Sequence, residues 1–299
     1  MRHGLEALSL PRQNADRVST RGALLLLAMS LVACEGPLES DQPVATTTHA
    51  LLRVKRSAVV NEEHEAIAEA FAGVVRVPEG TDPGPLLAAN GLTLPAAGSC
   101  VTSNRERDAL AGNVGQAEFL EAGAVVLKAS EAETLLAPRP FESSQAELTG
   151  VAYTTRDRAS EPLPGGAGYA LKTTGSEQLP ALELRVQAPE LLSEVAVAGG
   201  ALAELEQLSV ASAVPVSWRA GDAGDLVYVE VKGADVGTLG VCAFRDADGH
   251  GVLPAGLFGV HGNGGLSFHR MRQVAADAGA LDAAEVRFDF ELTAEVSFN

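Results

Sequence analysis

Alternating hydrophobic and polar positions recur along most of the chain, a pattern typical of half-buried β-strands. In residues 226–231, Tyr228 and Glu230 alternate with valines, and in residues 286–298 phenylalanine and leucine alternate with charged or polar neighbours. Clusters of Gly, Pro, Ser and Asp separate these short runs and predict turns between strands. The strands expected on this basis cover residues 124–127, 148–153, 169–173, 182–186, 194–198, 208–210, 214–218, 226–231, 241–244, 252–253, 266–274 and 286–298.

This rhythm predicts an all-β fold with at most one or two short helices. A chain of 299 residues exceeds what a single core usually fills, so we expect two consecutive β-sandwich-like domains. Pro189 marks the clearest boundary, which gives an N-terminal β domain over 50–188 and a C-terminal domain over 189–299. Seven or eight short strands in the second domain match an immunoglobulin-like or fibronectin-like sandwich.

Two segments near the start of the first domain allow more than one interpretation. Residues 62–77 are rich in Glu and Ala, which favour helix, but Ile67, Phe71 and Val75 also fit the alternation of a strand. We expect a strand there. Residues 82–91 predict a short helix, with Asp82 as its N-cap and Gly91 as its end.

The N-terminal region predicts export. Residues 22–33 form an apolar run of about 18 Å as a helix, too short for a hydrocarbon core of about 30 Å but right for a secretory signal. The run ends Leu31-Val32-Ala33-Cys34, which resembles a bacterial lipobox. The resemblance implies a signal peptide over 1–33, cleavage before Cys34 and lipidation of its sulfur. The alternative is an ordinary signal peptide followed by a chance cysteine.

The region before the apolar run is long for a signal and contains acidic residues. A start at Val18 would give a compact signal, so the true start, Met1 or Val18, stays open. Residues 34–49 are polar with Pro and Thr, and we expect a disordered tether between lipid and body.

The charge is strongly acidic. The chain carries −17 formally, and removal of residues 1–33, which hold four arginines and two acidic residues, leaves −19. Such a surface repels nucleic acid, so no nucleic-acid partner is expected.

The passages GSCV, AGAVVL, LPALELRVQAPE, VPVSW, LVYVEV, GVCAF, DADGHGVLPAGLF and LSFHRMR, together with the lipobox, resemble a multi-copy lipoprotein family of GC-rich Gram-negative bacteria. The resemblance covers roughly residues 71–299. It implies a β-sandwich body behind a lipid anchor and assigns no catalytic residues. Many members carry more cysteines in the first region, where this chain has only Cys100.

The sharpest local motif is Asp246-Ala247-Asp248-Gly249-His250-Gly251. Asp at positions one and three and Gly at six are half of a calcium loop, but calcium prefers oxygen to the nitrogen of His250. Asp246, Asp248 and His250 are therefore only weak metal candidates, and no metal or cofactor is expected. A hairpin turn is the simpler interpretation.

Further candidates for chemistry are few. His261 and His269 follow later in the chain, without a close pair at ligand spacing. No G-x-S-x-G motif occurs, and Ser267 has strand context. The glycine pairs 165–166, 199–200 and 264–265 are expected to form turns.

The cysteines and the single tryptophan are expected to be structural. Cys242 lies in an apolar strand and is expected to be a core thiol, while a bond between Cys100 and Cys242 is the alternative. Trp218 is expected to fill the core of a sandwich rather than to form a ligand platform.

These features together predict a non-catalytic interaction or adhesion protein of the cell envelope. Cys34 would anchor it to the outer membrane, with the body periplasmic or surface-exposed and a protein or polysaccharide as partner. The alternatives are an envelope-acting metal-dependent hydrolase and a lipoprotein that binds a small ligand or a metal.

Overall fold

The computed structural model describes residues 45–62, 66–87, 94–102, 117–140, 148–155, 163–234, 237–259, 261–277 and 279–299. The predicted signal peptide, the predicted lipidation site Cys34 and the predicted helix end at Gly91 lie outside these ranges. Residues Val44–Asn299 form one compact unit. No helix in the described part is both long and apolar enough to cross a membrane.

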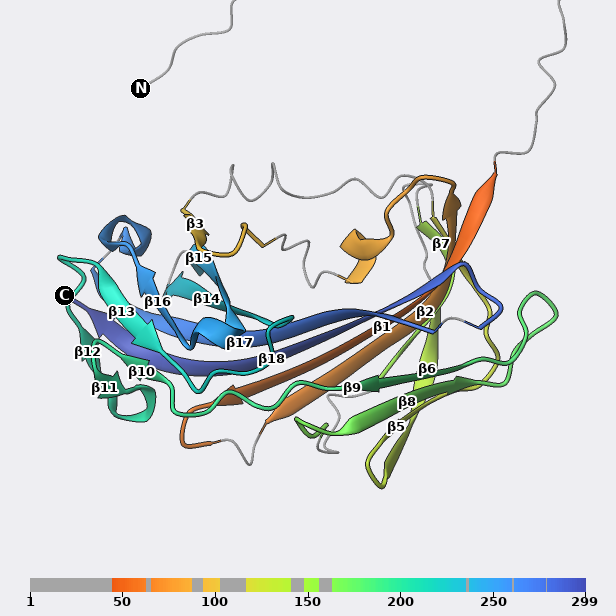
Figure 1. The fold of residues 1–299 in the computed structure, drawn as a ribbon, viewed down its shortest axis with the longest axis horizontal. Coiled ribbons are helices and arrows are strands. Elements are labelled where there is room, and N and C mark those ends of the chain that lie inside the picture. Colours follow the sequence, from red (N-terminus) through yellow and green to blue (C-terminus); the bar gives the residue numbers. More distant parts are fainter. Residues whose placement is uncertain are drawn as a thin grey trace, which may run out of the picture. The chain divides into compact units, whose positions relative to one another are not determined.

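The described residues form an all-β fold, as predicted, with one large mixed sheet of 14 strands and a small sheet of four (Figure 1). The strands are β1 Thr46–Val59, β2 Ile67–Pro78, β3 Ser99–Val101, β4 Ala117–Leu120, β5 Val125–Ala129, β6 Ala132–Pro140, β7 Leu148–Thr154, β8 Gly168–Thr173, β9 Glu183–Gln187, β10 Ala196–Val197, β11 Gly200–Ala201, β12 Gln207–Leu208, β13 Val214–Ser217, β14 Leu226–Gly233, β15 Gly237–Arg245, β16 His250–Leu253, β17 Gly262–Ala276 and β18 Ala283–Phe298. Short 3₁₀ turns cover η2 Gly84–Leu87, η4 Leu202–Glu204, η5 Asp246–Asp248 and η6 Ala255–Phe258.

Three long strands run side by side through the centre of the large sheet (Figure 1). Strands β17 and β18 form an antiparallel hairpin whose register runs from Gly262↔Phe298 to Ala276↔Ala284. Strand β1 pairs in parallel with β18, so the first and last described strands are neighbours. Successive side chains along each strand point to opposite faces of the sheet, so each face receives every second side chain.

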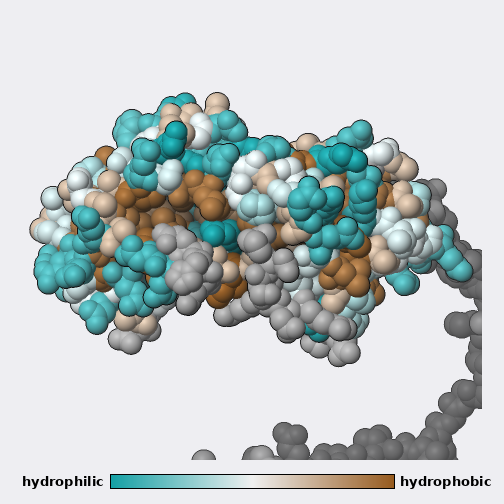
Figure 2. Space-filling view, turned by 90° about the horizontal axis from the view of Figure 1, so that it is seen from below, coloured by the Kyte–Doolittle hydropathy of each residue, from teal (hydrophilic) through white to brown (hydrophobic). Residues whose placement is uncertain are grey.

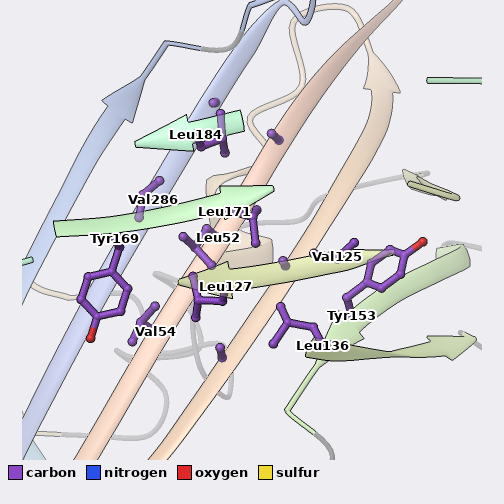
Figure 3. Packing of buried hydrophobic residues seen from close by; sticks show 14 of the residues in the cluster. Leu52, Val54, Val125, Leu127, Leu136, Tyr153, Tyr169, Leu171, Leu184 and Val286 are labelled. Carbon is purple, nitrogen blue, oxygen red and sulfur yellow. The ribbon is translucent and has the colours of Figure 1, made fainter. Parts of the chain in front are cut away.

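The first hydrophobic core, called core 1, lies between the long strands and a layer made of β5, β8 and β9. Leu52 and Val54 on β1 and Val286 on β18 face Leu127 and Leu171 across this core (Figure 3). Strand β6 joins the two layers because its first half pairs with β5 and its second half pairs with β7. Burial of one such large side chain contributes about 1.5–3 kcal/mol.

The second hydrophobic core, called core 2, lies between the small sheet and the other end of the large sheet. The small sheet has the order β11-β10-β13-β16 and contributes Val216 and Leu253. The large sheet contributes Val229 on β14, Phe268 on β17 and Val296 on β18. Two facing sheets around one core are the arrangement of a β-sandwich.

The predicted boundary at Pro189 coincides with a change of core but not with two separate units. Most buried residues between Ala50 and Ala188 pack in core 1 or in a smaller cluster around Leu51 and Phe119, and most of those between Val195 and Phe268 pack in core 2. Strand β18 returns to core 1 through Phe288 and reaches core 2 through Phe298. The two-domain division therefore stays a prediction, since one hairpin supplies both cores.

Arg272 connects the layers of core 1 on the side away from β6. Its Nη1 donates to the Gln187 carbonyl on β9 (3.2 Å), and its Nε and Nη2 both bind the Asp225 carboxylate at 2.7 Å. Strand β9 ends the strand order of the large sheet, and an unprotected edge strand can pair with other chains. The Arg272 side chain thus occupies a backbone acceptor at the end of the edge strand β9.

Most predicted strands are present, and the ambiguous segment 62–77 contains strand β2, as expected. Asp82 accepts a hydrogen bond from the Gly84 amide (2.8 Å), but the turn that follows is 3₁₀ rather than α-helical. The prediction that Gly264 and Gly265 form a turn is wrong, because both lie inside β17. Strand β1 begins at Thr46, within the predicted tether.

Candidate functional site

Alternate side chains on the face of the large sheet opposite core 2 form a polar cluster. We name it the His269 cluster and define it by six residues: Tyr228, Lys232, Ser267, His269, Asp289 and Glu291. Strand register brings them together, because Tyr228 pairs with His269 and His269 pairs with Glu291 across β14, β17 and β18. The cluster therefore depends on the same pairing that builds both cores.

His269 lies at the centre of the cluster and is 3% exposed. Its Nδ1 lies 2.9 Å from Asp289 Oδ1, and its Nε2 lies 3.7 Å from Glu291 Oε1. The imidazole stacks on the Tyr228 ring, with centroids 4.1 Å apart and planes 11° apart. The Tyr228 hydroxyl donates to Asp289 Oδ2 (2.7 Å), so both oxygens of that buried carboxylate are engaged.

Lys232 and Ser267 form the second half of the cluster. Lys232 Nζ donates to Ser267 Oγ (2.8 Å) and to Glu291 Oε1 (3.1 Å), and it lies 3.4 Å from Glu230 Oε2. The other Glu291 oxygen accepts a hydrogen bond from Ser57 Oγ on β1 (2.7 Å). Glu291 thus links three strands through charge-assisted hydrogen bonds.

These contacts shift the pKa values of the carboxyl groups downward. Burial alone would raise the pKa of Asp289 and of Glu291, as it does for any carboxyl taken out of water. The His269 imidazole beside both groups, the Tyr228 hydroxyl on Asp289 and the Lys232 ammonium on Glu291 outweigh burial and lower both pKa values. Both groups are carboxylates at neutral pH.

The pKa values of Lys232 and Tyr228 shift upward. Burial opposes the charge of Lys232, but Glu291 and Glu230 raise its pKa above the ordinary value. Burial and the Asp289 carboxylate raise the pKa of Tyr228. Lys232 therefore keeps its proton and Tyr228 stays a neutral phenol.

These protonation states do not activate Ser267. A serine nucleophile paired with lysine needs a neutral amine to accept the hydroxyl proton. Lys232 is held as an ammonium that donates to Ser267, and Ser267 is fully buried. The described contacts of this dyad are those of a structural network.

The motif at Asp246 builds a buried ion pair. Asp246 is 0% exposed, its Oδ1 accepts from Arg270 Nη2 (2.9 Å), and its Oδ2 lies 2.8 Å from Arg270 Nε. Trp218 Nε1 also donates to Asp246 Oδ1 (2.9 Å). Arg270 Nη1 donates to the carbonyls of Glu190 and Leu191, so the pair fixes the chain just past Pro189.

The three weak metal candidates do not share a site. Asp246 is engaged by Arg270, Asp248 Oδ2 accepts from Arg245 Nε (3.1 Å), and His250 Nδ1 lies 2.7 Å from the Asp248 carbonyl. No group of three or more His, Cys, Asp or Glu side chains in the described ranges could hold a metal ion. The turn itself is present, with Gly249 at φ 65°. It is not a hairpin, because β15 and β16 belong to different sheets.

Cys100 and Cys242 form a disulfide, so the expectation that Cys242 is a free core thiol is wrong. The two cysteines face each other across β3 and β15, which places their Cα atoms 4.0 Å apart. The bond joins segments 142 positions apart in the sequence. The prediction that Trp218 fills the core is confirmed, since it is 5% exposed within core 2.

Sequence reasoning missed Tyr228, Asp289 and Glu291 as members of one cluster. The available signal was the presence of carboxylates inside an otherwise apolar strand, at 289 and 291. Charged residues are rarely buried unless they are paired. That signal predicts partners but does not name them, because the partners lie on other strands.

Comparison with known proteins assigns no family. No protein-family model matches the chain, and no curated protein matches it. Among solved structures, the chain is similar to the FN1–FN3 domains of chicken CNTN1, at 12% identity and a TM-score of 0.19, over 74% of this chain and 75% of that chain. A TM-score this low does not assign a shared fold. The resemblance to the lipoprotein family stays a prediction.

Proposed function

We propose that this chain is a lipid-anchored protein of the bacterial cell envelope whose body binds a partner and does not catalyse a reaction. The observation that carries the proposal is the Cys100–Cys242 disulfide, because such bonds persist outside the cytosol. It supports the export predicted from residues 22–34. Lipidation of Cys34 would then hold the body at the outer membrane.

Two features support binding rather than catalysis. The His269 cluster holds its carboxylates and lysine in fixed charge states, without an activated nucleophile among its members. On the face seen in Figure 2, hydrophobic residues reach the surface among hydrophilic ones. Hydrophobic areas with polar rims mark interaction surfaces on many soluble bodies.

The finer fold assignment is part of this proposal. Strands β10, β13 and β16 lie in one sheet, and strands β15, β14, β17 and β18 lie in order in the other. Strand β11 also pairs with β10, so two four-stranded layers enclose core 2, and they support an immunoglobulin-like or fibronectin-like sandwich over residues 189–299. This scaffold presents loops and sheet faces to partners on unrelated proteins.

Membrane fractionation of cells that express the parent or Cys34→Ala tests the proposal. We expect the parent in the membrane fraction and the variant in the soluble periplasmic fraction. Ser40→Ala is the control, because it changes a polar residue of the predicted tether and leaves both Cys34 and the disulfide unchanged. Equal partitioning of the parent and Cys34→Ala would overturn the proposal.

A further inference from the structure

A groove of about 670 Å³ opens beside the His269 cluster, at the end of the sheet where β14, β17 and β18 meet. This volume lies within the range of ligand sites in proteins. Lys232, Gly265 and Glu295 are direct neighbours across the three strands and form its floor and two walls. Asn263, Ser297 and Glu206 complete the polar lining.

The floor of the groove is open because residue 265 lacks a side chain. The neighbouring Gly264 is required by packing, since a Cβ there would lie 2.3 Å from the Lys232 carbonyl oxygen and 2.4 Å from the Phe298 ring. A Cβ at Gly265 would meet only the Ala294 carbonyl oxygen, at 3.2 Å. Glycine inside a strand can mark a bulge, a tight bend, or the close approach of a ligand or of another backbone segment. Packing thus excludes a side chain at Gly264 and leaves little room for one at Gly265, where the contact would be with a backbone atom.

The lining favours a ligand that brings hydrogen-bond donors. Lys232 directs its ammonium to Ser267, Glu291 and Glu230, so its charge is already balanced inside the protein. The carboxylates of Glu206 and Glu295 accept hydrogen bonds only, and Asn263 and Ser297 can accept as well as donate. An anionic ligand would meet carboxylates on both sides.

We propose that this groove binds a neutral saccharide chain through its hydroxyl groups. The inference rests on the proposed function and names the class of partner that the anchored body would bind. Hydroxyl groups suit the acceptors of Glu206 and Glu295 and the amide of Asn263, and the flat floor at Gly265 admits a sugar ring.

The test is binding of the purified full chain to a printed array of defined oligosaccharides, with titration calorimetry on those retained. Spermidine and polyphosphate serve as cationic and anionic probes. We expect neutral oligosaccharides to bind. Gly265→Val should weaken their affinity at least about ten-fold by filling the floor, and Glu295→Gln should weaken it about ten-fold through loss of a charged acceptor.

Gly224→Ala is the matched glycine control, because nothing lies within 4 Å of a Cβ there, and its affinity should equal that of the parent. If Gly265→Val fails to fold, Glu295→Gln still tests the inference, because Glu295 is exposed and its substitution should leave the fold intact. Absence of saccharide binding, equal binding by parent and Glu295→Gln, or binding of spermidine or polyphosphate alone would overturn the inference. None of these outcomes depends on whether Cys34 carries lipid. A negative binding result would therefore overturn the saccharide proposal without bearing on the lipid anchor.

Discussion

Asp246 and Arg270 form an ion pair that protein atoms isolate from water, with exposed side-chain fractions of 0% and 2%. Burial of two charges is unfavourable unless hydrogen bonds satisfy both of them. Trp218 donates one such bond to Asp246, and the carbonyls of Glu190 and Leu191 accept two from Arg270. The pair therefore connects four segments: the Asp246 turn, strand β17, Trp218 and residues 190–191.

We predict that Asp246→Asn lowers the free energy of unfolding by about 3–5 kcal/mol, because the shape is kept while Arg270 loses its counter-charge. The matched control is Asp248→Asn, whose partner Arg245 is 69% exposed and whose loss should cost at most about 1 kcal/mol. Chemical denaturation of both variants measures the difference. Equal losses would show that burial does not set the strength of the Asp246 pair.

Glu291 makes stability depend on pH at the acid end. The pKa of Glu291 is lowered in the folded protein. Its contribution to the free energy of unfolding is therefore complete above the pKa of an unfolded glutamate, about 4.3, and is progressively lost as the pH falls below that value. We predict that Glu291→Gln lowers the melting temperature at pH 7. The difference in melting temperature between the variant and the parent (the gap) should narrow toward pH 3. Glu118→Gln, at an exposed ion pair with Arg76, should show a much smaller gap at every pH. A constant gap for Glu291→Gln would contradict the linkage.

At the scale of elements, strand β3 depends on one covalent bond. It pairs with β15 through only three residues, and Cys100 lies in the middle of them. Val101 beside it packs on Tyr228 and Val241, on the same face as the His269 cluster. The disulfide thus keeps this face of the sheet covered.

We predict that the double variant Cys100→Ala/Cys242→Ala loses about 2–5 kcal/mol of unfolding free energy, the usual effect of removing a native disulfide. Hydrogen exchange should also become faster in β3 than in β18. The parent in dithiothreitol should match the double variant. Unchanged stability and exchange would show that backbone pairing alone holds β3.

The sequence predicted elements well where alternation was long and poorly where it was short or broken. Strands β14 and β18 have clear alternation, whereas β3 and β11 are too short to show a period. Strand β6 contains Pro138 and Pro140 and an exposed Leu135, so its sequence does not resemble a strand. It forms because it changes partners from β5 to β7, which only the folded chain reveals.

The candidate site could not be predicted for a related reason. Its contacts join residues 20 to 61 positions apart, such as His269 with Asp289 and Tyr228 with Asp289. Which residues meet depends on strand order and register, and a shift by one residue would move Asp289 to the opposite face of the sheet. The Asp246 motif was visible and was expected to form a turn, but its ion pair with Arg270 was not foreseen because the two residues lie on different elements.

At the scale of the whole molecule, the β17–β18 hairpin couples the two cores. Phe288 packs against Tyr169 in core 1, with ring centroids 5.0 Å apart, and Phe268 packs in core 2. Both side chains are fully buried. A cavity in either core therefore weakens the packing of β17 and β18, and both cores depend on these two strands.

We predict that Phe288→Ala and Phe268→Ala each lower the free energy of unfolding by about 3–5 kcal/mol and that each variant unfolds in a single transition. Differential scanning calorimetry distinguishes this outcome from independent domains. Two transitions, with only one of them shifted in each variant, would instead support separate domains on either side of Pro189.

The central claim is that a lipid at Cys34 holds this disulfide-bonded, sheet-built body at a bacterial membrane. Mass spectrometry of the mature N-terminal peptide, from protein extracted out of the cell envelope, tests it most directly. The account predicts a peptide that begins at Cys34 and carries the mass of a diacylglyceryl group on its sulfur. An unmodified Cys34, or a peptide that still contains the residues before it, would contradict the account.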